Sequence, residues 1–241
     1  MLYHLGCGEQ RLDGYVNVDI RATDATDLVA DLNTLQLPDP ATGIFSHAFF
    51  EHLRRDSRTP HLHAARLALE PGGFVCYLGL PDFHRVAQLY LEGGPGVIGP
   101  TFDLRNVYRY THGDPEQTAS DAGWIGQLHK SLFDVPEVAG LLRDAGYPSY
   151  VVFSYVFPGE PPQADVSLGF FATGDREAVD VLQQRCTAFL EQFDGRFIDL
   201  KSIRFADGAS RSTAHAAVVG GPQRTALRRV ARVLADKLSK V

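Results

Sequence analysis

The residues best suited to chemistry come early in the chain. A short apolar run, 2–5, leads directly into Gly6-Cys7-Gly8, and a second run, 15–19, ends in Asp19. Glycines at such a turn let a ligand approach the main chain closely and leave N–H groups exposed to it. An acid at the end of the next strand can accept hydrogen bonds from both hydroxyls of a ribose. The pattern predicts a nucleoside site, and a tight turn beside a solvated Asp is the alternative.

A framework of alternating strands and helices has to position these residues. Short apolar runs bounded by turn residues predict strands at 2–5, 15–19, 28–31, 44–50, 74–80, 150–157 and 166–172. Apolar residues at three- and four-residue steps predict helices at 58–69, 83–92, 135–145 and 176–193. This order indicates an α/β protein with a mostly parallel sheet of seven strands, the last two of which pair as an antiparallel hairpin.

Two stretches fall outside this pattern. Residues 93–130 combine glycines with aromatic and polar residues at no regular spacing. Long irregular segments in compact domains are often functional, so we interpret this one as a lid over a substrate, with a decorative insertion as the alternative. We expect residues 1–174 to form one ligand-binding domain and residues 175–241 to form a C-terminal helical extension with a basic end.

Composition excludes several classes of protein. With 44% hydrophobic and 22% charged residues among 241, the chain is typical of a globular protein and not of a disordered one. No apolar run approaches the roughly 18 residues that a membrane span needs. The three cysteines, at 7, 76 and 186, show no CxxC spacing, which argues against a disulfide framework or a four-sulfur zinc site. We expect a cytoplasmic protein.

Charge is divided unevenly along the chain. From Arg196 onward ten Lys and Arg stand against three Asp, a net charge of +7, which leaves −13 on the rest. An acidic body argues against nucleic acid as a partner, since phosphates need a positive surface. The basic end, from about Pro222, has an apolar helical stripe. We expect it to dock on the chain's own body; docking on a partner or a second copy in a homodimer, and peripheral contact with an anionic membrane, are the alternatives.

Further segments resemble those of a known family in their order and spacing. They are Leu5-Gly-Cys-Gly8, Tyr15-Val-Asn-Val-Asp19, Asp31, Leu37-Pro-Asp-Pro40, Phe49-Phe-Glu-His-Leu53, Leu69-Glu-Pro-Gly-Gly73 and Leu80-Pro-Asp82. Together they resemble the class I methyltransferases that depend on S-adenosylmethionine (SAM) and have a Rossmann-like fold, in particular a branch that acts on sugars, glycans or natural products. The resemblance covers about residues 2–175. It implies an enzyme with SAM as its cofactor and a small-molecule or glycan acceptor.

The resemblance assigns roles by position along the sequence. It implies that the glycine turn lines the methionine part of SAM and that Asp19 holds the ribose hydroxyls. Phe49 and Phe50 would close the pocket beside the sulfonium, and Asp31 and Leu32 would flank the adenine. The complete set of expected cofactor-binding residues is Gly6, Cys7, Gly8, Asp19, Ile20, Asp31, Leu32, Phe49 and Phe50.

The sequence departs from the family in its first turn. Only six residues separate Gly8 from Tyr15, too few for a full crossover helix, which weakens any role for a helix dipole in binding. Gln10 and Arg11 interrupt the GxGxxG pattern, which disfavours a nicotinamide cofactor. No helix precedes the first predicted strand, so we expect the lid, the C-terminal segment or a partner to cover SAM.

Three residues are the catalytic candidates. Because a sulfonium is already an activated leaving group, the protein mainly has to align the acceptor and remove its proton. His129 precedes helix 135–145 as a histidine does in the family, and we expect it to be the base, with a structural hydrogen bond as its alternative. Glu51, together with His52, matches the family's Glu-His pair. Asp82 is the third candidate, and capping the helix that follows it is an equal alternative.

Aromatic side chains in the lid are suited to hold the acceptor. Tyr108, Tyr110, His112 and Trp124 are the expected substrate-binding residues. Rings of this kind stack on sugars or aromatic acceptors, but they also simply pack a loop against the protein, which is the alternative.

We expect no metal site. His61 and His63 are two residues apart on a predicted helix, so their side chains point in different directions. A magnesium or zinc arrangement that includes Glu51 and His52 is the alternative.

These observations favour O-methylation of a hydroxyl on a sugar, a glycan intermediate or a secondary metabolite. The alternative from another class is a non-catalytic scaffold or regulatory subunit that binds SAM or a nucleoside and acts through its basic tail. A nicotinamide-dependent oxidoreductase comes third, because glycine turns followed by an acid are shared among folds.

Overall fold

The structure is a computed structural model, and it describes residues 1–113 and 126–207. The expected substrate residue Trp124 and the basic helix expected from about Pro222 lie outside the described residues. The other expected site residues all lie within them.

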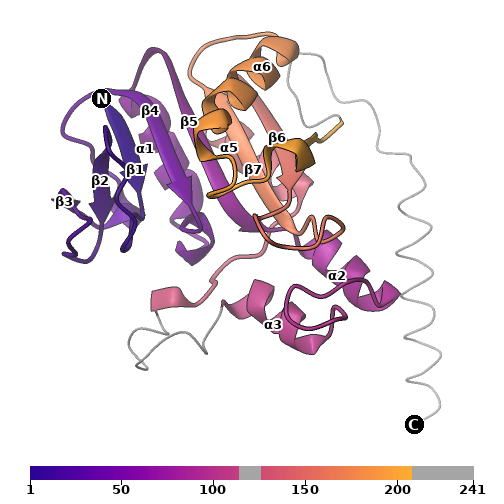
Figure 1. Cartoon of the computed structure of the whole chain (residues 1–241). Helices are drawn as coiled ribbons and strands as arrows, with labels where there is room; N and C mark the ends of the chain where they lie inside the picture. Colours follow the sequence, from indigo (N-terminus) through magenta and orange to yellow (C-terminus); the bar gives the residue numbers. More distant parts are fainter. Residues whose placement is uncertain (114–125, 208–241) are drawn as a thin grey trace.

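Eight strands form a single sheet in the order β3-β2-β1-β4-β5-β7-β6-β8 (Figure 1). Their bounds are β1 Leu2–Leu5, β2 Val16–Asp19, β3 Leu28–Val29, β4 Ala41–His47, β5 Leu69–Pro81, β6 Ser149–Tyr155, β7 Ser167–Thr173 and β8 Arg204–Phe205. The first five strands in chain order are parallel to one another, and β7, β6 and β8 add antiparallel pairs. The predicted Rossmann-like sheet and its antiparallel hairpin are confirmed. The additional strand, β8, has two residues at the sheet edge, too few for a periodic signal.

Five α-helices and four short 3-10 helices accompany the sheet. Their bounds are α1 Arg58–Ala68, α2 Phe83–Glu92, α3 Leu104–His112, α5 Val135–Asp144, α6 Val179–Leu190, η1 Leu32–Thr34, η2 Phe50–His52, η4 Glu191–Phe193 and η5 Leu200–Ser202. These counts refer to the described ranges. Helix α3 was not predicted, because its nine residues bury only Asn106 and Tyr110 and so show little apolar periodicity. None of the helices in the described part of the chain has the length and hydropathy needed to span a bilayer.

Helices cover both faces of the sheet. Neighbouring residues of a strand point to opposite faces, so Ile44 packs with α1 and α5 whereas Phe45 packs with α6. In the same way, Val75 packs with α1 and α5, and its neighbour Cys76 packs with α6. Burial on both sides explains why these strands are continuously apolar. It also leaves the carboxyl ends of the parallel strands as the place where a ligand can bind. Helix α6, which follows residue 174, packs on this sheet.

The link between β1 and β2, residues 6–15, is a turn and contains no helix, as its length predicted. The side chain of Asn17 holds this link in place. Its Oδ1 accepts a hydrogen bond from the N–H of Leu12 at 2.9 Å, and its Nδ2 donates to the carbonyl of Leu12 at 3.1 Å. Residues from the far end of the described chain cover this link. Phe193 of η4 stacks on Phe45 at 4.2 Å, and Arg196 donates to the carbonyl of Arg11 at 3.4 Å.

Candidate active site

Two adjoining cavities open at the carboxyl ends of the parallel strands. One, here called the glycine cavity, has a volume of about 300 Å³ and is lined by Gly6, Gly8, Asp19, Ile20, Leu32 and Phe49 among others. The other, the histidine cavity, has about 560 Å³ and includes Glu51, His129, Tyr110 and Glu160 in its wall. Four residues line both cavities: Arg21, Ala48, His52 and Gln127. A ligand in one cavity is therefore next to a ligand in the other.

The glycine turn has a backbone that other residues rarely adopt. Gly6 and Gly8 have φ of +68° and +54°, in the left-handed region. A Cβ on Gly6 would lie 2.6 Å from Cβ and Cγ of Phe49, so the turn is packed directly on that ring. The turn after β1 and the side chain of Phe49, which follows β4, are therefore in contact at the cavity wall.

Asp19 holds the turn at the end of β2. Its Oδ2 accepts the N–H of Gly8 at 2.8 Å, and its Oδ1 accepts the N–H of Arg21 at 2.9 Å. Each carboxylate oxygen can accept a second hydrogen bond. The side chain is only 10% exposed, yet the residue lines the cavity. Asp19 can therefore hold both the turn and a pair of ligand hydroxyls.

The opposite wall of the glycine cavity comes from η1. Asp31 accepts the N–H of Asn33 at 2.9 Å, and this hydrogen bond lowers the pKa of the Asp31 carboxyl. The carbonyl of Leu32 faces Nδ1 of His61 at 2.7 Å, and Nε2 of His61 lies 2.8 Å from the hydroxyl of Tyr77. Burial lowers the pKa of His61 to about 4, so it is a neutral core side chain that supports Leu32.

Two expected cofactor residues face away from the glycine cavity. The sulfur of Cys7 is buried 3.8 Å from the hydroxyl oxygen of Thr26. The ring of Phe50 packs in the core, 5.6 Å from the ring of Phe133. Because η2 begins at Phe50, the two adjacent rings of Phe49 and Phe50 diverge, one toward the cavity and one toward the core.

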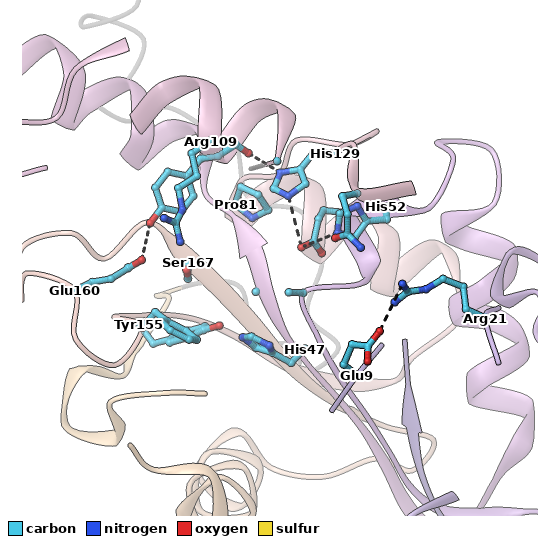
Figure 2. A pocket seen from close by; sticks show the side chains of 17 residues that line it. Glu9, Arg21, His47, His52, Pro81, Arg109, His129, Tyr155, Glu160 and Ser167 are labelled. Atoms are coloured by element: carbon cyan, nitrogen blue, oxygen red, sulfur yellow. Dashed lines mark hydrogen bonds and ion pairs between the residues drawn. The ribbon is translucent and has the colours of Figure 1, made fainter. Parts of the chain in front are cut away.

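Glu51, His52 and His129 meet in the wall of the histidine cavity. Glu51 and His52 lie on η2, just after β4, and residues 128–131 run beside them. The N–H of Lys130 donates to the carbonyl of Glu51 at 2.8 Å, which brings His129 next to both. Figure 2 shows the rings of His52 and His129 beside each other in the cavity wall, with their centroids 5.1 Å apart. The two Nε2 atoms lie 3.7 and 4.0 Å from Oε1 of Glu51.

The electrostatics of this cluster are dominated by burial. Glu51 is 1% exposed, and burial raises the pKa of its carboxyl to about 8. Burial likewise lowers the pKa of His52 to about 4 and lowers the pKa of His129. Both imidazoles are therefore neutral near pH 7 and can accept a proton or bind a cation.

The remaining expected residues are spread over several environments. The Tyr110 hydroxyl donates to Oε1 of Glu160 at 2.9 Å in the histidine cavity. Tyr108 is 43% exposed and stacks on His112 at 4.6 Å, and neither residue is in the wall of the two cavities. Asp82 caps α2, because its Oδ1 accepts the N–H groups of His84 and Arg85. Capping of this helix is the alternative to a catalytic role that the sequence analysis gave for Asp82.

Other wall residues were not found from the sequence. Arg21 follows Asp19 by two positions, and Ala48 follows β4, so the rule that ligands bind at strand ends could have found both. Ala48 has φ of +51°, a strained conformation for a residue with a side chain, at the boundary between the cavities. Arg109, Tyr155 and Glu160 carry no comparable sequence signal, because they come from three separate segments.

None of the known family descriptions matches the sequence, and no curated protein sequence matches it either. Among solved structures, a SAM-dependent methyltransferase of Thermotoga maritima is 12% identical, with 72% of this chain and 81% of that chain covered and a TM-score of 0.45. The glycopeptide N-methyltransferase MtfA in complex with SAM is 14% identical, with 73% and 81% covered and a TM-score of 0.44. Human N-acetylserotonin methyltransferase in complex with SAM is 14% identical, with 73% and 47% covered and a TM-score of 0.40.

Proposed function

We propose that this chain is a SAM-dependent methyltransferase that methylates a hydroxyl of a sugar, a glycan intermediate or a secondary metabolite. The observation that carries the proposal is the shared wall of the two cavities. A glycine turn fastened to Asp19 lies on one side of that wall, and a cluster of neutral histidines lies on the other. Such a pair suits a nucleoside donor and an acceptor that have to meet.

The glycine cavity suits the donor. Each carboxylate oxygen of Asp19 accepts one N–H, and Nε of Arg21 lies 3.6 Å from Oδ1. Each oxygen can accept a second hydrogen bond, from a ribose hydroxyl. Leu32, held by His61, offers an apolar surface to the adenine, while Gly6 and Gly8 line the cavity beside the methionine part of SAM. The sequence resemblance carried by these residues supports the same assignment.

The histidine cavity suits a hydroxyl acceptor. In the transfer, the acceptor oxygen forms a bond to the methyl carbon while the S–CH₃ bond breaks and its electron pair stays on sulfur. The hydroxyl proton passes to Nε2 of His129, which is neutral and lines the cavity. The carboxyl of Glu160 and the hydroxyl of Tyr110 add polar groups farther along the wall, which favours an acceptor with several hydroxyls.

Calorimetry tests the donor half of the proposal. The unaltered chain should bind SAM and its demethylated product, and Asp19→Ala should weaken that binding at least about 100-fold, because two hydrogen bonds to a charged group are lost. Asp24→Ala is the matched control, since Asp24 is exposed and lies outside the wall of either cavity. Binding of NADH without binding of SAM would overturn the proposal.

Transfer of a labelled methyl group to a panel of sugars, glycans and phenolic metabolites tests the acceptor half. His129→Ala should keep its affinity for SAM and slow the transfer. Binding of SAM with no transfer to any hydroxyl acceptor would instead favour the scaffold alternative.

A further inference from the structure

The cluster of Glu51, His52 and His129 has the composition of a metal site. Each side chain offers one ligand atom, and the three atoms all lie within 4.8 Å of one another. The residues come from two segments that are far apart in the sequence. The segments are held together by the main-chain hydrogen bond from Lys130 to Glu51 and by the hydrogen bond between the His52 ring and the carbonyl of Leu128.

The orientation of both histidines is fixed by their other ring nitrogen. Nδ1 of His52 lies 3.2 Å from the carbonyl oxygen of Leu128, and Nδ1 of His129 lies 2.8 Å from that of Tyr110. A carbonyl oxygen only accepts, so each Nδ1 carries the hydrogen and each Nε2 carries a lone pair. Histidines that bind metals are oriented in this way, with the second nitrogen donating to a carbonyl or carboxylate.

The three side chains of the cluster make no hydrogen bonds to one another. The Nε2 atoms lie 3.7 and 4.0 Å from Oε1 of Glu51, too far for hydrogen bonds. Oε2 of Glu51 is buried and has no hydrogen-bond partner. A buried carboxyl group and two imidazole lone pairs that lack hydrogen bonds are costly. A proton on Glu51 or a metal ion between the three side chains lowers that cost.

The distances suit a bound ion after a small contraction. Two ligand atoms at about 2.1 Å from one ion, at a tetrahedral angle, are about 3.4 Å apart. The observed Nε2–Oε1 separations of 3.7 and 4.0 Å are about 0.3 and 0.6 Å longer, and the two Nε2 atoms lie within 4.8 Å of each other. Binding of one ion therefore requires the three side chains to move closer together.

We propose that Glu51, His52 and His129 bind a divalent first-row transition metal ion, with the remaining coordination positions open to the histidine cavity. Two imidazoles and one carboxylate favour ions such as Zn²⁺, Co²⁺ or Fe²⁺ over Mg²⁺, which prefers oxygen ligands alone. This site differs from our expectation from the sequence, which assigned no metal.

The role of the ion in transfer rests on the proposed function. Positions open to the cavity allow the acceptor hydroxyl to bind the ion, which lowers the pKa of that hydroxyl. With the ion bound, Nε2 of His129 would be a ligand, and the ion would supply the activation of the hydroxyl that His129 supplies as a base in the metal-free chain.

Cobalt titration of the full-length, metal-stripped chain tests the site without measuring activity. CoCl₂ should produce a visible absorption band that saturates at one ion per chain. Glu51→Gln and His129→Ala should each weaken the affinity about 100-fold or more, since removing a supporting residue alone costs 10- to 100-fold. His84→Ala is the control, because His84 is exposed at the start of α2 and should leave the titration unchanged.

Two outcomes would overturn the proposed metal site. One is that the unaltered chain shows no saturable absorption band with cobalt, and the other is that both variants bind cobalt with the same affinity as the parent. Either result returns the role of base to His129. Calorimetry with SAM in the presence of a chelator keeps the two proposals separate. If SAM binds but no metal does, the metal site alone fails; if cobalt binds and SAM does not, the proposed function fails and the metal site stands.

Discussion

Replacing Glu51 by Gln should stabilise the metal-free protein at neutral pH. Burial raises the pKa of Glu51 in the folded protein to about 8, above its ordinary value of 4.5. Between these two values the folded state binds a proton that the unfolded state has released. The free energy of unfolding of the parent therefore falls as pH rises through this window, and this loss is complete above pH 8. Gln has the same shape and stays neutral, and its amide can donate to Nε2 of His52 or His129.

The size of the effect follows from the width of the window. Each pH unit between the two pKa values corresponds to about 1.4 kcal/mol. From pH 5 to pH 7 the stability of Glu51→Gln relative to the parent should therefore rise by about 3 kcal/mol. For a chain of this length that is about 5 to 10 °C in Tm at neutral pH, with little difference at pH 5.

Urea denaturation followed by circular dichroism, at pH 5, 6, 7 and 8 with a chelator present, measures this difference. The buried histidines, such as His4 and His61 with pKa lowered to about 4, make both proteins more stable as pH rises to about 6.5, so their contribution cancels in the comparison. Glu92→Gln, at an exposed position, is the control and should differ from the parent by the same small amount at every pH. A stability difference for Glu51→Gln that does not change with pH would refute the reasoning.

Two further substitutions test the glycine turn and the role of Asp82. Gly6→Ala should lose SAM binding and be about 1 to 3 kcal/mol less stable than Gly14→Ala in urea denaturation, because only the first adds a clash with Phe49; Gly14 also has positive φ but open space around it. Equal stability of the two would contradict the contact. Asp82→Ala should cost about 1 kcal/mol of stability, as loss of a helix cap does, and leave the rate of methyl transfer unchanged. A rate lowered more than about tenfold, or by about 1.4 kcal/mol of transition-state stabilisation, would give Asp82 a catalytic role.

The sequence predicted the glycine cavity better than the histidine cavity. Gly6, Gly8 and Asp19 are close in the sequence, and the turn between two parallel strands is enough to bring them together. His129 is 77 positions from His52 and 78 from Glu51, and its place depends on the hydrogen bonds between residues 128–131 and η2. Tertiary packing decides which ring nitrogen of each histidine faces the cavity and how deeply Glu51 is buried. The local amino-acid sequence carries no pattern that indicates either.

The packing of Arg196 on the turn after β1 has a consequence for how the protein is made. Arg196 contacts Gln10 and Arg11 across 186 and 185 positions of sequence, and Phe193 stacks on Phe45 beside them. On the ribosome, the N-terminal strands emerge long before the residues that cover them. Until residues 193–196 have been made, Phe45 and the turn after β1 lack these covering side chains. The two cavities are lined by residues no later than Ser167, so the segment that braces the turn is synthesised after every residue of the cavity walls.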